Sequence, residues 1–119
     1  MENSEYRPLS DREREVLVWL LEHGPEDATN FLSQLDLVGA RSSCSCGCPS
    51  IEFSVPVDAP FIHSPQGMRL FAEGHTGTDE VGIMLTAGSG VLSALEVYTY
   101  GGVDHAFGLP LLDTLRPSN

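Results

Sequence analysis

Two amphipathic helices are predicted near the start of the chain. Residues 10–13 read Ser-Asp-Arg-Glu, a capping box in which Ser10 and Glu13 each satisfy an amide at the helix start. The apolar residues that follow at helical spacing are Val16, Leu17, Leu20 and Leu21. Gly24 and Pro25 end this helix, and Pro25 opens a second one. The apolar face of the second helix comprises Ala28, Phe31, Leu32 and Leu35. The two helices fill about residues 10–36, and each has a single apolar face to pack on a sheet.

From about residue 37 the apolar pattern changes to a period of two, which is typical of strands. Strands are predicted at 37–43 and 50–55, as a hairpin around a cysteine-rich turn. Residues 56–67 hold three of the eight prolines and are expected to form a surface loop.

Three further alternating segments lie at 68–74, 81–85 and 91–100, with short Gly-containing turns between them. They predict an antiparallel meander, after which residues 103–119 lie back on the domain. We therefore expect an α+β fold with two N-terminal helices on one face of a mostly antiparallel sheet of about five strands. A flexible arm is expected at 1–9 and a single domain at 10–119.

The excess of acidic over basic residues limits which classes of binding partner the protein is expected to have. The chain of 119 residues carries 17 acidic residues against six arginines and no lysine, for a net charge of −11. This excess disfavours nucleic acid and anionic membrane surfaces, both of which need clustered cations. It favours a basic protein partner, although such charge also serves solubility alone. The N-terminus lacks a signal-peptide pattern, and no apolar run is long enough to span a membrane, so we expect a cytoplasmic protein.

The cysteines Cys44, Cys46 and Cys48 are the most distinctive cluster. An odd number within five residues is not a disulfide framework, which leaves reduced thiols or metal ligands. Zinc would need a fourth ligand, which could be His63, His75 or His105, and His75 is our choice. The spacing matches no standard zinc motif, so the sequence favours the absence of a cofactor, with zinc as the alternative.

A cysteine nucleophile would need a histidine and a third residue that orients it. His75 with Asp79, or His105 beside Asp104, could take these roles, but nothing in the sequence brings either pair to the cysteines. The sequence therefore favours a role other than catalysis.

Glu96, Tyr98 and Tyr100 fall on one face of the last predicted strand. If that face is covered they form a polar cluster able to bind a ligand, and if it is open they form a solvent face. Alternation favours the open face. Exposed tyrosines there would suit a protein contact, including a homodimer.

Two resemblances are present. Residues 9–17 resemble the opening of the helix-turn-helix domain of bacterial response regulators, but the next predicted helix is acidic rather than basic, which argues against that family. The Cys-x-Cys-Gly-Cys-Pro-Ser turn at 44–50 and the Leu-Glu-Val-Tyr strand at 95–98 are similar to a group of small actinobacterial proteins. That resemblance implies a bacterial source and no particular activity.

The sequence thus predicts a small acidic binding or interaction domain. The alternative is a zinc-binding protein that uses the cysteines at 44–48. A small enzyme with a Cys/His or Glu/His site is the third hypothesis.

Overall fold

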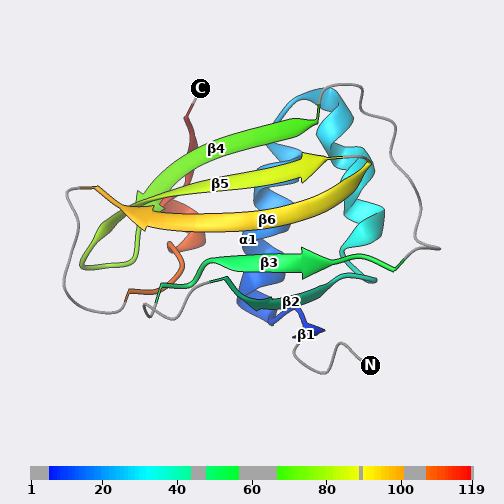
Figure 1. Ribbon diagram of the computed structural model, residues 1–119. Helices are drawn as coiled ribbons and strands as arrows, with labels where there is room; N and C mark the ends of the chain where they lie inside the picture. Colours follow the sequence, from blue (N-terminus) through cyan, green and yellow to red (C-terminus); the bar gives the residue numbers. More distant parts are fainter. Residues whose placement is uncertain (1–5, 44–47, 57–66, 89, 101–106, 119) are drawn as a thin grey trace.

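The computed structural model describes residues 6–43, 48–56, 67–88, 90–100 and 107–118. Its centre is an antiparallel sheet of seven strands in the order β1-β2-β3-β6-β5-β4-β7. The strands are β1 (Arg7–Pro8), β2 (Gly39–Ser42), β3 (Ile51–Ser54), β4 (Met68–His75), β5 (Glu80–Gly88), β6 (Val91–Thr99) and β7 (Arg116–Pro117). Helix α1 (Asp11–Glu22) and the 3-10 helix η1 (Glu26–Gln34) cover one face of the sheet (Figure 1). The predicted α+β class is confirmed.

Helix α1 begins at the predicted capping box. The Glu13 amide donates to Ser10 Oγ at 3.1 Å, and the Ser10 amide donates to Glu13 Oε1 at 2.8 Å. The predicted apolar stripe is buried throughout: Val16, Leu17, Leu20 and Leu21. The helix ends at Glu22, with His23 as its C-cap. The chain then turns at Gly24, where a Cβ would lie 2.9 Å from Leu70 Cδ2, so a larger residue there would require the Leu70 side chain on β4 to shift.

The second helix forms where expected but as a 3-10 helix. Its first residue follows Pro25, which offers no side-chain cap. Within it, the hydroxyls of Thr29 and Ser33 donate to the carbonyls three residues back, at 3.0 and 3.2 Å. Such local bonds compete with the α-helical pattern and favour the tighter turn.

A buried glutamine joins η1 to the sheet. Gln34 is 0% exposed, its amide nitrogen donates to the Gly90 carbonyl at 2.8 Å, and its oxygen accepts from the Leu92 amide at 3.0 Å. These two bonds fix the helix over the turn between β5 and β6.

The expectation of about five strands was too low. The predicted strands correspond to β2–β6, including the hairpin (Ser42 opposite Ile51) and the β4-β5-β6 meander. The additional strands, β1 and β7, have two residues each and both read Arg-Pro. So short a segment carries no period-two pattern, and proline removes a ladder donor, which explains why the sequence did not predict them. Strand β1 lies within residues 1–9, the segment expected to be a flexible arm. Its Arg7 and Pro8 are instead paired with β2.

The C-terminal segment lies back on the domain, as predicted. β7 pairs with β4 after a short 3-10 helix, η2 (Leu112–Thr114), and the Ser118 amide donates to the Phe71 carbonyl at 3.0 Å.

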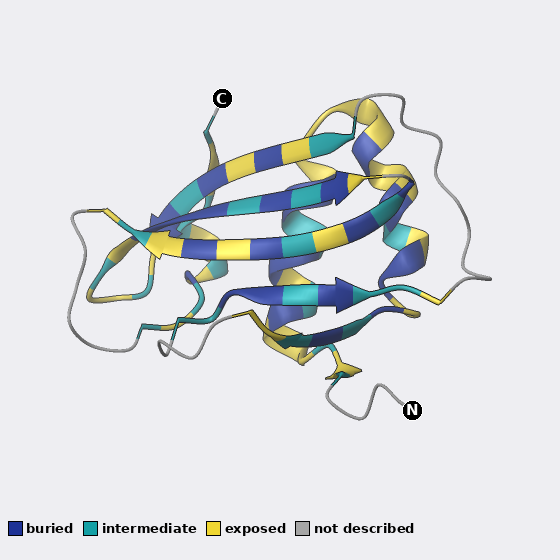
Figure 2. Ribbon diagram, viewed as in Figure 1, coloured by how far each residue is buried: buried dark blue, intermediate teal, exposed yellow. Residues whose placement is uncertain are grey.

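The core lies between the helices and the inner face of the sheet. Inward positions alternate with outward ones, so buried and exposed bands follow one another along β4 and β6 (Figure 2). The sheet contributes Leu70, Ala72, Val81, Ile83, Leu85, Leu92, Leu95 and Val97 to this core. No helix in the described part of the chain is both long and apolar enough to cross a membrane.

Candidate docking surface

The sheet face opposite the helices carries an aromatic and acidic surface. We call it the tyrosine face and define it by Phe71, Glu73, Glu80, Met84, Glu96, Tyr98 and Tyr100. The register aligns Glu73, Gly82 and Tyr98 in one row across β4, β5 and β6, and Phe71, Met84 and Glu96 in the next row. Tyr98 is 38% exposed and Tyr100 50% exposed. The structure thus brings together the three residues that alternation placed on one face, and leaves them accessible.

The aromatic pair is held in place by a glycine. A Cβ at Gly82 would lie 2.5–2.7 Å from three atoms of the Tyr98 side chain, so the ring rests directly on the β5 backbone. An aromatic ring across from a strand glycine fills the space that the missing side chain leaves. Tyr100 meets Tyr98 edge to face, with ring centroids 5.8 Å apart and planes at 83°. Two tyrosines fixed in this way offer a contact surface that loses little conformational entropy on binding.

The charges around the tyrosines are negative. Partial burial raises the pKa of Tyr100, and Tyr98 and the Glu73 and Glu80 carboxylates raise it further. The Tyr100 hydroxyl therefore stays protonated at neutral pH, as a hydrogen-bond donor. Glu96 projects from the middle of β6 and is exposed.

Two of these carboxylates lie near basic side chains on the surface. Glu73 lies 3.5 Å from an Arg116 nitrogen, and Glu80 lies 3.7 Å from His75 Nε2. Exposed pairs at such distances contribute little to stability, so both carboxylates can exchange partners.

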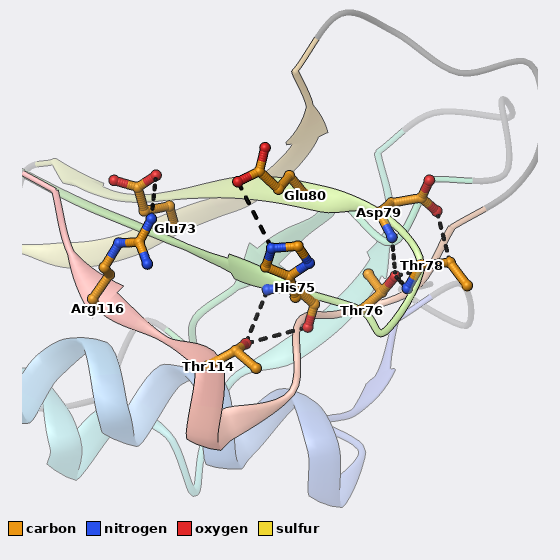
Figure 3. A network of polar contacts seen from close by, with 8 residues as sticks. All are labelled: Glu73, His75, Thr76, Thr78, Asp79, Glu80, Thr114 and Arg116. Atoms are coloured by element: carbon orange, nitrogen blue, oxygen red, sulfur yellow. Dashed lines mark hydrogen bonds and ion pairs between the residues drawn. The ribbon is translucent and has the colours of Figure 1, made fainter.

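Around the turn between β4 and β5, a polar network ties the C-terminal segment to the sheet (Figure 3). The backbone amide of His75 donates to Thr114 Oγ1 at 2.9 Å, and the Leu111 amide donates to the His75 carbonyl at 2.7 Å. Inside the turn, the Thr78 and Asp79 amides donate to Thr76 Oγ1. The network joins the backbone of β4 to the segment before β7, which is a structural role.

The structure places His75 away from the described cysteine. Strands β6 and β5 lie between β3 and β4, so His75 is separated from β3 by about 14 Å across the sheet. Cys48 is half-buried just before β3, whereas Cys44, Cys46, His63, Asp104 and His105 lie outside the described residues. Among the residues that the structure describes, no group of three or more His, Cys, Asp or Glu side chains is arranged to hold a metal ion. Zinc binding by the cysteine turn stays a prediction.

Five of the six arginines are paired with carboxylates. The pairs are Arg7 with Glu13 (2.8 Å), Arg12 with Glu15 (3.9 Å), Arg14 with Asp36 (2.8 Å), Arg41 with Glu52 (3.0 Å) and Arg116 with Glu73 (3.5 Å). Arg69 has no carboxylate partner among the described residues. Sequence reasoning did not single it out, because most of the other pairs, such as Arg14 with Asp36 and Arg41 with Glu52, join residues that are distant in the sequence.

Trp19 is a second residue that the sequence undervalued. It falls to the side of the apolar stripe of α1 and borders two hollows, of about 420 and 360 Å³. The signal was present, since a tryptophan beside the buried stripe of a helix is only partly covered.

Comparison of the chain with protein-family models, curated proteins and solved structures found no match.

Proposed function

We propose that this protein is a small binding domain that docks a basic partner protein on its tyrosine face. The observation that carries the proposal is the exposed, edge-to-face pair of Tyr98 and Tyr100 among the carboxylates of Glu73, Glu80 and Glu96. Tyrosine is enriched at protein interfaces, because it combines a rigid apolar ring with a polar group.

The chemistry of this face suits lysine and arginine side chains. A cation over the face of a tyrosine ring is attracted by the ring electrons, and a neighbouring carboxylate adds a charge-assisted hydrogen bond. Phe71 and Met84 supply apolar area beside the acids, and Phe71 is 38% exposed. This combination resembles the centre and rim of a protein interface.

The charge of the whole molecule favours a basic partner over the other occupants. A second copy would bring another net charge of −11 against the same acidic face, which opposes association. Nucleic acid is disfavoured for the same reason, and the pairing of five arginines leaves few cations for phosphate.

Calorimetric titration with a short peptide of alternating Arg and Gly tests the proposal. We expect saturable, salt-sensitive binding that Glu96→Lys weakens about tenfold, as for loss of a charge pair at an interface. The matched control is Glu22→Lys, since Glu22 is also exposed but lies on α1, on the opposite layer. Charges more than about 8 Å apart are screened at physiological salt, so this control shifts the affinity less than about twofold.

Equal weakening by the two variants would contradict the proposal, because it would mean that only net charge matters. A dimer that forms at micromolar concentration and is lost on Glu96→Lys would also contradict it, because a second copy would then occupy the face.

A further inference from the structure

The larger of the two hollows lies at the β4 edge of the sheet and shares only Phe71 with the tyrosine face. It measures about 420 Å³, within the range typical of small-molecule sites. Leu20 and Leu70 are its buried members, and Trp19, His23, Arg69 and Phe71 supply its aromatic and cationic lining. Gly24 and Pro25 border it where the chain leaves α1, and Pro117 borders it from β7.

One wall is a pre-formed aromatic stack. The Trp19 and His23 rings lie 4.1 Å apart at 13°, and His23 Nδ1 is 2.8 Å from the Trp19 carbonyl oxygen. Because a carbonyl only accepts, the assignment that satisfies this contact puts a proton on Nδ1. This hydrogen bond and the stacking hold the His23 ring against the indole, so the aromatic wall is in place before a flat ligand arrives.

The charge in this pocket is opposite to that of the molecule. Arg69 is exposed, and within the described part of the chain it has no carboxylate partner and no acidic residue lines the pocket. A guanidinium offers a planar fork of donors that fits a carboxylate or sulfonate. A cation with no carboxylate partner among the described residues, beside an aromatic wall in so acidic a chain, points to an anionic ligand.

We infer that this pocket binds a small aromatic anion, whose ring stacks on Trp19 and whose acidic group pairs with Arg69. The inference does not rest on the proposed docking function, because the aromatic wall comes from α1 and the pocket shares with the tyrosine face only Phe71, not the tyrosines or the carboxylates.

Anilinonaphthalene sulfonate (ANS), an aromatic anion, is a suitable probe. Trp19 is the only tryptophan of the chain, so energy transfer from tryptophan to bound ANS reports proximity to this wall. We expect saturable transfer, and about tenfold weaker binding for Arg69→Gln, the usual effect of losing one charge-assisted hydrogen-bonded pair. Arg116→Gln removes the same charge from β7 outside the pocket lining and is expected to change the affinity less than about twofold.

A neutral analogue, N-phenylnaphthylamine, separates charge recognition from apolar binding. The inference predicts that it binds more weakly than ANS and that Arg69→Gln leaves its affinity unchanged. Equal binding of the two probes, ANS binding without energy transfer from Trp19, or unchanged ANS affinity in Arg69→Gln would each overturn the inference. Glu96→Lys should leave ANS binding intact, which keeps failure here distinguishable from failure of the docking proposal.

Discussion

The two faces of the sheet are built from the same strands, but one face is buried under the helices and the other is open to solvent. On the covered face, Leu85 and Leu95 are 0% exposed and pack under α1 and η1. On the other face, Met84 and Glu96 occupy the intervening positions of the same strands and reach solvent. Alternation thus lets one strand pair serve the core and present a contact surface together.

Polar groups also differ between the two faces. Those in the covered layer have well-defined partners: Gln34 bonds two backbone groups, and Ser50 Oγ bonds the Val97 amide and carbonyl at 2.8 and 3.1 Å. Those on the tyrosine face are loosely paired, as in the 3.5 Å contact between Glu73 and Arg116. Polar groups in the covered layer therefore stabilise the fold, whereas those on the open face remain available to a partner.

The largest difference in the free energy of unfolding is expected between alanine substitutions on the two faces of β5. Leu85→Ala leaves a cavity under the helices and should lower the free energy of unfolding by about 2–5 kcal/mol. Met84→Ala, one residue away on the tyrosine face, should cost less than about 1 kcal/mol, as for partly exposed positions. Urea denaturation followed by circular dichroism measures both, and similar losses would break the distinction between the faces.

The second-largest loss of stability is expected at the buried Gln34. Gln34→Ala leaves the Gly90 carbonyl and the Leu92 amide buried without their partner and should cost about 2–4 kcal/mol. Ser33→Ala removes an exposed hydroxyl from the same helix and serves as the control. Hydrogen exchange of the Leu92 amide should accelerate in the first variant, and an unchanged rate would show that the bond is dispensable.

The helix layer also contains a buried carboxylate whose protonation should affect stability. Glu13 is 7% exposed, and its bidentate bonds to Arg7, both 2.8 Å, hold its pKa below the usual value. A lowered folded-state pKa means that its contribution is full above the unfolded value of about 4.3 and is lost as the pH falls through the folded pKa.

Glu13→Gln should therefore cost about 1.5–2 kcal/mol at neutral pH, at the lower end of the range for a hydrogen bond to a charged group because Arg7 is half-exposed. The gap between wild type and variant should shrink in acid, which denaturation at a series of pH values measures. Glu96→Gln is the comparison on the open face, and a pH-dependent gap of similar size there would contradict the assignment.

A smaller effect than that at Glu13 is expected at Gly82, the β5 residue whose backbone the Tyr98 ring covers. Gly82→Ala would force the Tyr98 ring off β5, since the new Cβ would lie within 2.7 Å of it. We expect a loss of about 1 kcal/mol, a common size for a single substitution, together with weaker binding of the Arg-Gly peptide. Calorimetry on the variant checks both, and full retention of peptide affinity would show that the ring position does not matter for docking.

Periodicity made much of this fold predictable. The capping box at Ser10, the alternating strands and the shared face of Glu96, Tyr98 and Tyr100 are local patterns, readable from neighbouring residues. Strands β1 and β7 could not be predicted from the sequence. Each is a single Arg-Pro dipeptide, and only its pairing with a distant strand, β2 or β4, makes it part of the sheet. The position of the Tyr98 ring over Gly82 likewise depends on a contact between two strands, and the lack of a carboxylate partner for Arg69 among the described residues depends on the tertiary structure.

Amide chemical-shift mapping with the Arg-Gly peptide tests the central claim most directly. The account predicts that shifts which saturate with peptide concentrate on β5 and β6 around Met84, Glu96 and Tyr98, with smaller changes on α1. Shifts spread evenly over the acidic residues of both layers, or centred on α1, would contradict it.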